Sequence, residues 1–294
     1  MGVCSILLFA TSAAAATSTP LPLLKLRGGE VKPLRYGMET GKYTARPAVK
    51  PQKIVNIDPM EVGDTEKVYV LQQFEKPEVR LAFMRKVYSI VTAQLAVTAL
   101  IVYVLRNVPG LLPGLVQKLG TAIGLLPLIP LTLLAVIPGV RGSGSNLAYL
   151  LLAIFTVLEG LAVGAFTWFL PTSLILRAAG ATTVATGGLT LYALTTKRDF
   201  TMLGGMLYSC LLGLLALGIM QYFIGGNLLQ SGRAALGTFV FCGYLIVNTQ
   251  MMMGGNKAKQ LRPNEHIMAA ITLYTDILNL FLHILAAMAR SERD

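Results

Sequence analysis

Long apolar runs dominate this chain, and most of its polar positions fall between them. A helix needs about 20 predominantly apolar residues to cross a hydrocarbon layer about 30 Å thick. We therefore expect a membrane-spanning helix at each of seven runs. They cover residues 87–105, 121–140, 146–170, 174–196, 200–224, 232–253 and 266–289. The pattern predicts an all-α polytopic membrane protein, a bundle of seven transmembrane helices.

The N-terminal part of the chain lacks this pattern. Residues 1–16 contain a short apolar run with an Ala-rich end, which is the outline of a signal or targeting segment. Residues 17–78 are Pro-rich and mixed in charge, so we expect a disordered N-terminal extension there. The helical domain is expected to occupy residues 79–294.

Charge is scarce for a chain of this length and is mostly positive. Only 13% of the residues are charged and the net charge is +11, yet no basic stripe with interleaved aromatic residues favours a nucleic-acid partner. Basic residues instead orient the spans, because Lys and Arg are enriched in cytoplasmic loops. Near the span ends, ten lie in the flank before span one or in the loops after even-numbered spans, against four in the loops after odd-numbered spans: Lys76, Arg80, Arg85, Lys86, Arg141, Lys197, Arg198, Lys257, Lys259 and Arg262 against Arg106, Lys118, Arg177 and Arg233.

This count places the flank before span one on the cytoplasmic or equivalent side. A cleaved signal peptide would send the same flank across the membrane, so the two indications conflict. Two alternatives stay open. Either residues 1–16 do not act as a signal, or they belong to a leader that is used in several targeting steps.

The last predicted span carries an acid near its middle. A carboxylate near the middle of a membrane helix costs roughly 2.5–3.5 kcal/mol on insertion scales, so it normally faces protein or water. Asp276, Asn279 and His283 have the spacing i, i+3 and i+7 and share one face of the predicted helix. We interpret Asp276 as a functional acid on an ion or proton path, with a structural, hydrogen-bonded carboxylate as the alternative. His283 is either a supporting residue or a solvated side chain near the interface.

Small residues inside the spans have simpler interpretations. Gly160 with Gly164, Gly187 with Gly188, and Gly204 with Gly205 are expected to let neighbouring helices approach closely. The cysteines within the spans are interpreted as small apolar packing residues.

Five segments in order resemble the transmembrane Bax inhibitor motif family, which includes the Lifeguard and Golgi anti-apoptotic proteins. The strongest are ALGTFVFCGYLIVNTQMMMGG at 235–255 and LRPNEHIMAAITLYTDILNLFLHIL at 261–285. The others are VRLAFMRKVYSIVTAQLAVTA at 79–99, NLAYLLLAIFTVLEGLAVG at 146–164 and LTLYALTTKRDFTMLGG at 189–205. The resemblance covers nearly everything after position 78.

The resemblance implies a calcium-conducting pore that is gated by pH. In the family the span-seven aspartate, here Asp276, pairs with an aspartate in a span-six segment usually written YDTQ. The corresponding segment of this chain is VNTQ, with Asn248 at that position. Two adjacent carboxylates share a proton and titrate as a coupled pair, whereas an Asn and Asp pair has one titrating group. We therefore expect a blunted pH response and a weak calcium site at Asp276, without a further cofactor.

The resemblance also implies two more residues of the ion path. Glu159 lies inside span three, where the family carries a glutamate, and the alternative is a protonated structural residue. Arg141 lies where relatives have an arginine cluster that can latch the span-seven aspartate. Its other interpretation is an ordinary cytoplasmic anchor, because the sequence GSGS replaces most of that cluster.

As a function, the resemblance implies a calcium or cation leak channel of an internal membrane that protects against cell death. The endoplasmic reticulum or Golgi is the expected location, with a mitochondrial or plastid membrane as the alternative. Expected partners are the lipid bilayer, calcium and cell-death regulators of the Bcl-2 type. A non-conducting scaffold for such regulators is the competing function. We expect no enzyme activity, because the Ser residues of residues 142–145 lack the order and helix-start position of an intramembrane serine protease.

Overall fold

The structure of this protein is a computed structural model. It describes residues 77–108, 110, 123–136, 145–224, 227–253 and 265–292. The predicted targeting segment at 1–16, nearly all of the predicted extension and Arg141 lie outside the described residues.

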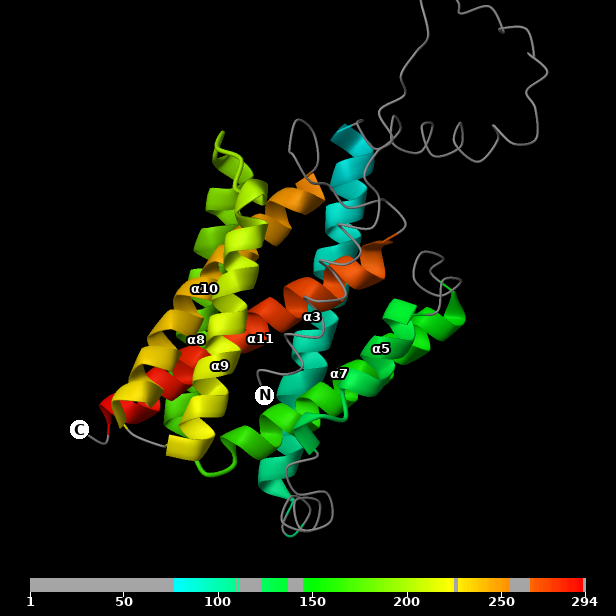
Figure 1. The fold of residues 1–294 in the computed structure, drawn as a ribbon. Coiled ribbons are helices and arrows are strands. Elements are labelled where there is room, and N and C mark those ends of the chain that lie inside the picture. Colours follow the sequence, from blue (N-terminus) through cyan, green and yellow to red (C-terminus); the bar gives the residue numbers. More distant parts are fainter. Residues whose placement is uncertain are drawn as a thin grey trace, which may run out of the picture.

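The described part of the chain is helical, which confirms the predicted fold class (Figure 1). Six helices are long and apolar enough to cross a membrane, and a shorter seventh lies between the first and second of them. The helices are α3 (Pro77–Asn107), α5 (Leu128–Val136), α7 (Asn146–Thr167), α8 (Thr172–Thr195), the 3₁₀ turn η2 (Thr201–Leu203), α9 (Gly204–Ile224), α10 (Asn227–Met253) and α11 (His266–Ser291).

Helix α5 is shorter than the predicted span 121–140. It has nine residues, a length of about 13.5 Å at 1.5 Å per residue. Pro127 directly precedes it and Pro130 lies in its first turn, where the missing N–H of proline is tolerated. Leu131 and Leu134 are fully buried, and the helix packs against α7.

Helix α3 begins ten residues before the predicted start of span one at residue 87. Its 31 residues extend about 46 Å, which is more than the hydrocarbon layer requires. Pro77 and Glu78 suit the first turn of a helix, because proline has no N–H to leave unpaired and an acidic side chain interacts favourably with the helix dipole. The basic residues Arg80, Arg85 and Lys86 are therefore part of the helix itself.

The helices form two groups with α11 between them. Helices α3, α5 and α7 lie on one side, and α8, α9 and α10 lie on the other (Figure 1). Helix α11 contacts α3, α7, α8 and α10. In the 18-residue apolar stretch of α11 that would lie in the membrane, 83% of the residues are buried, against 17% in the corresponding stretches of α8 and of α9. The most enclosed helix of the bundle is thus the one that carries Asp276.

Glycines bring α3 and α7 into close contact. A Cβ atom on Gly160 would stand 2.8 Å from Cδ1 of Ile101, and one on Gly164 would clash with Leu105. The prediction for this pair is confirmed. It is wrong for Gly187, Gly188 and Gly205, because a Cβ atom on any of them would meet nothing within 4 Å.

Candidate functional site

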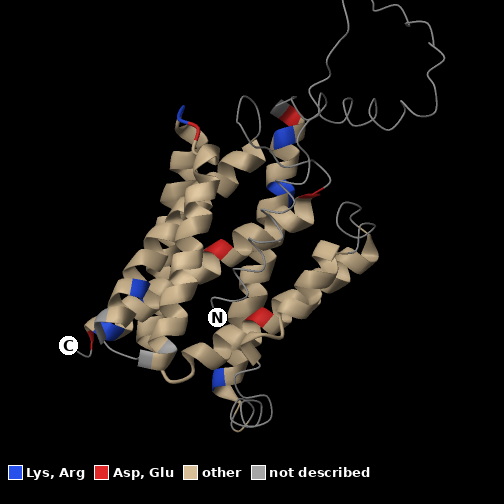
Figure 2. Ribbon diagram, in the orientation of Figure 1, with Lys and Arg blue, Asp and Glu red and all other residues tan. Residues whose placement is uncertain are grey.

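Asn248 of α10 and Asp276 of α11 meet inside the bundle. The side-chain amide Nδ2 of Asn248 donates a hydrogen bond to Oδ2 of Asp276 over 2.6 Å. Asp276 has no exposed surface and Asn248 is buried as well. Figure 2 shows basic residues mainly near the helix ends, whereas acidic residues also occur within the apolar bundle. The structure thus brings together the two residues that the sequence predicted as a pair.

Half of the Asp276 carboxylate has no hydrogen-bond partner in the described part of the chain. Its Oδ1 atom is buried and receives no donor from these residues. A buried carboxylate oxygen without a partner is costly, because it loses its hydration without a replacement. A proton, a water molecule or a cation would each satisfy this atom, and those are the species that an ion path carries.

Tyr274 fixes α11 next to this acid. Its hydroxyl forms a 2.7 Å hydrogen bond with Oγ1 of Thr98 on α3, and its ring packs edge-on against Phe155 of α7 at 6.0 Å. One turn earlier in α3, Nε2 of Gln94 donates to Oγ1 of Thr156 on α7 over 3.0 Å. Tyr274 thus fixes α11 against α3 and α7, and the Gln94–Thr156 bond joins α3 to α7.

Sequence reasoning missed this group. Gln94 and Thr98 are four residues apart on one face of an otherwise apolar run, and the hydrogen bond from Thr98 Oγ1 to the Gln94 carbonyl joins them. That i, i+4 polar spacing was a signal from which an inward-facing stripe could have been predicted.

Gln250 connects the same turn of α10 to the loop between α8 and η2. Its Oε1 accepts a hydrogen bond from the N–H of Phe200 over 2.7 Å, and its Nε2 donates to the Arg198 carbonyl over 2.9 Å. In this loop Asp199 accepts hydrogen bonds from the N–H and Oγ1 of Thr201. These bonds attach the loop to α10 at Gln250, two residues after Asn248.

Glu159 is buried in the adjoining helix α7. Its neighbour Gly160 packs on Ile101 of α3. The predicted contribution of Glu159 to an ion path stays a prediction, as does the latch by Arg141.

Asn279 and His283 continue the face of α11 that carries Asp276. Asn279 is buried and donates its side-chain amide to the Thr275 carbonyl over 2.8 Å. His283 is half-buried, and its ring stacks on Phe241 of α10 at 5.5 Å and 22°. The predicted polar face is therefore an interface with α10.

No group of three or more His, Cys, Asp or Glu residues converges within the described ranges. The weak calcium site at Asp276 therefore has one carboxylate as its charged ligand and stays a prediction. Ser145, the last residue of the segment weighed for protease chemistry, accepts a hydrogen bond from the N–H of Ala148 and caps α7. That is a structural role.

Comparison with known proteins identifies the family. Residues 80–293 match the family described as "Inhibitor of apoptosis-promoting Bax1". The chain belongs to the Bax inhibitor family. The resemblance stated from the sequence is thereby confirmed, and the chain is an integral membrane protein of this family.

Three relatives illustrate the family match. Protein lifeguard 4 of Mus musculus is 40% identical over 214 residues, which are 70% of this chain and 84% of the relative. The Golgi anti-apoptotic protein of Vaccinia virus (strain Lister) is 33% identical over 222 residues, 73% of this chain and 88% of the relative. Bax inhibitor 1 of Schizosaccharomyces pombe is 33% identical over 213 residues, which are 70% of this chain and 76% of the relative.

Proposed function

We propose that this protein is a cation leak of an internal membrane, through which calcium passes down its gradient, and that Asp276 is the acid on its path. The observation that carries the proposal is the fully buried Asp276 carboxylate, with Oδ2 bonded to Asn248 and Oδ1 without a partner among the described residues. A purely structural carboxylate would be expected to have both oxygens satisfied. One free oxygen at the centre of the bundle suits an ion or a proton in transit.

Asn248 affects how strongly the proposed path binds calcium and how steeply it depends on pH. With one carboxylate and one amide, the pair holds at most one negative charge, so calcium is bound weakly. It also has one titrating group, and the coupled titration of two carboxylates is absent. The proposed leak therefore depends on pH less steeply than one with two adjacent acids.

The cellular role is proposed from the relatives' names. One relative is named a Golgi anti-apoptotic protein and another Bax inhibitor 1. We propose that this protein likewise lowers sensitivity to cell death, from the Golgi or the endoplasmic reticulum. Regulators of the Bcl-2 type are the proposed partners.

The test is calcium efflux from liposomes that contain the purified full-length protein, recorded between pH 6 and 8. We expect Asp276→Asn to reduce the flux to the level of empty liposomes, because the carboxylate no longer compensates the cation. Glu78→Gln is the matched control: it removes one exposed carboxylate at the start of α3 and should leave the flux at the wild-type level.

A second variant separates the role of Asn248. Asn248→Asp restores two adjacent carboxylates, so we expect a larger calcium flux that depends more steeply on pH than the wild-type flux. If wild-type flux is already steeply pH-dependent and Asn248→Asp leaves its pH profile unchanged, the role assigned to Asn248 is wrong.

The competing function is a non-conducting scaffold that binds cell-death regulators. The complete burial of Asp276 favours it, because the carboxylate is not exposed to solvent. Flux at the level of empty liposomes for wild type and for Asn248→Asp would support this scaffold and exclude the leak.

A further inference from the structure

The buried surroundings of α11 differ on the two sides of Asp276. Toward the N-terminus of α11, residues 267–271 and Leu273 join one apolar cluster with Met252 of α10. Toward the C-terminus, Asn279 and then His283 follow Asp276 on the same helix face. Polar side chains thus continue from Asp276 along this face toward the C-terminal end of α11.

Helix α10 matches this face along its length. Asn248 contacts Asp276, Gly237 lies against His283, and Oε1 of Gln230 accepts a 3.2 Å hydrogen bond from Arg290. Residue numbers fall in α10 as they rise in α11, so the helices are antiparallel. We call this interface, from Asn248 and Asp276 to Gln230 and Arg290, the α10–α11 seam.

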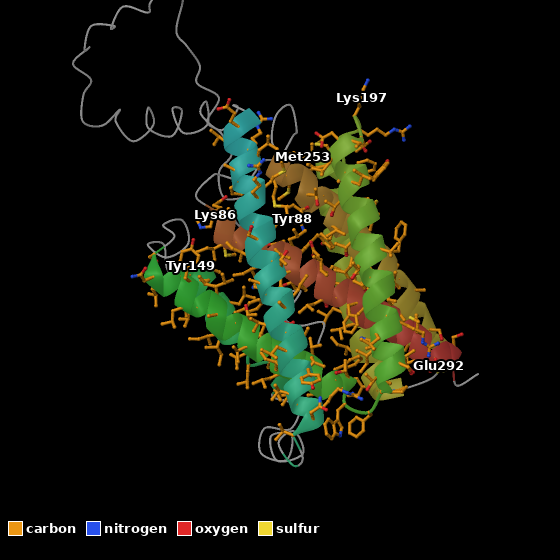
Figure 3. The ribbon with its side chains drawn as sticks, turned by 180° about the vertical axis from the view of Figure 1, so that it is seen from behind. Lys86, Tyr88, Tyr149, Lys197, Met253 and Glu292 are labelled. Atoms are coloured by element: carbon orange, nitrogen blue, oxygen red, sulfur yellow. The ribbon has the colours of Figure 1, made fainter. Side chains whose placement is uncertain are left out.

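The seam runs from the interior of the bundle to one of its ends. In Figure 3, Met253 lies at the same end as Lys197, and Glu292 lies at the other end. The seam runs from the level of Asp276 toward the end that carries Glu292. By the distribution of basic residues, this is the side opposite the cytoplasm.

The His283 ring lies across this seam. A Cβ atom on Gly237 would stand 2.5 Å from Nε2 of the ring and closer still to Nδ1 and Cε1, so only glycine leaves room for it. Phe241, one turn further along α10, stacks on the ring face. The glycine notch and the aromatic face together hold the imidazole between the two helices.

Positive charge lies one turn beyond Gly237 on α10. Arg233 is four residues before Gly237 on the same helix face, and its Nη1 atom is 3.6 Å from where a Cβ atom on Gly218 of α9 would stand. The other charged groups at this end include Arg290, bonded to Gln230, and the Arg177–Glu292 ion pair. Along α10, Arg233 is therefore one turn further from Asn248 than Gly237, which lies against His283.

We propose that His283, seated in the notch at Gly237, is a second closure of the ion path on the C-terminal side of Asp276. This inference rests on the proposed leak and adds to it a separate barrier two turns away from the acid. The ring blocks the seam sterically, and Arg233 adds an electrostatic barrier behind it.

The proposal predicts gain-of-leak variants. His283→Ala leaves a space one turn from Asn279 that water can enter, because His283 is half-buried and the space opens to the surface. We expect calcium efflux from liposomes to rise about tenfold, the factor that a barrier lower by about 1.4 kcal/mol produces. Gly237→Ala displaces the ring and should raise the flux in the same direction.

The two changes act on one contact, so the double variant Gly237→Ala, His283→Ala should leak no more than His283→Ala alone. Gly243→Ala is the matched control. Its Cβ atom would stand 2.8 Å from Cδ2 of Leu207 on α9. This clash lies between α10 and α9, not in the seam, so we expect wild-type flux. Equal gains from Gly237→Ala and Gly243→Ala would mean general loosening of the bundle and would overturn the proposal.

Asp276→Asn distinguishes failure of this inference from failure of the leak. If Asp276→Asn abolishes the flux and His283→Ala does not raise it, the leak stands and the second closure is wrong. If Asp276→Asn leaves the flux of both wild type and His283→Ala unchanged, the proposed path through Asp276 is wrong, and the closure is wrong with it. Flux that rises in His283→Ala and disappears when Asp276→Asn is added supports both.

Discussion

Helices α8 and α11 are similar as sequences and opposite as structures. They have 24 and 26 residues, and the mean hydropathies of their 18-residue apolar stretches are 1.3 and 1.6. Yet 17% of the residues in the α8 stretch are buried, against 83% in the α11 stretch. Hydropathy thus identifies both as spans but does not indicate which of them is enclosed by protein. Lipid tails are about as apolar as leucine side chains, so either environment suits an apolar helix surface.

Several polar side chains of the two helices differ in where their hydrogen-bond partners lie. In α8, the hydroxyls of Thr182, Thr183 and Thr195 donate to carbonyls of their own helix, four residues earlier. In α11, Tyr274 and Asp276 form hydrogen bonds with α3 and α10. A hydroxyl that is satisfied within its own helix tolerates lipid, whereas a carboxylate requires a partner from another element.

The largest expected difference in stability is between alanine variants of two tyrosines, one in α11 and one in α8. Tyr274→Ala in α11 leaves a cavity in the fully buried centre and should cost about 3–5 kcal/mol of stability, as for other buried aromatic residues. Tyr192→Ala in α8 removes a side chain that is 44% exposed and should cost much less. Thermal unfolding of both variants in the same detergent measures the difference, and similar losses would contradict the central position of α11.

Overpacking should give a smaller contrast of the same kind. Ala270→Leu adds volume at a fully buried position of α11 and is expected to destabilise by about 1–3 kcal/mol. Ala181→Leu makes the identical change on the exposed face of α8 and should remain within about 0.5 kcal/mol of wild type. Unfolding temperatures that shift equally in the two variants would argue against the burial assigned to these faces.

The smallest contrast concerns single hydroxyl groups. Tyr274→Phe removes the hydrogen bond to Thr98 and should cost about 0.5–1.5 kcal/mol. Thr183→Val removes a hydroxyl that bonds only within exposed α8 and is expected to be nearly neutral. Hydrogen exchange of the α3 and α11 amides adds a local measurement, because only Tyr274→Phe should accelerate it. Unchanged exchange in Tyr274→Phe would show that this bond does not fix α11 against α3.

Part of the site was predictable from the sequence. The resemblance to the family, through the VNTQ segment and the acid of span seven, implied Asn248 and Asp276 as a pair, and the structure places them in contact. Gln250, Thr98 and Tyr274 were not predicted as members of the site, because their contacts lie 52 and 176 residues away along the chain. Long-range pairing of this kind depends on how each helix is rotated, which apolar runs in membranes barely indicate.

The sequence by itself determined the fold class, the family and most span limits. Its predicted limits at Asn146, Met253 and His266 coincide with helix ends in the structure, because apolar length is a local property of the chain. Only the tertiary structure decided that α11 is enclosed, that Asp276 has one partnered oxygen, and that His283 lies in the Gly237 notch. Those facts depend on which helices pack together and at what rotation, and the local pattern of polar and apolar residues does not specify either.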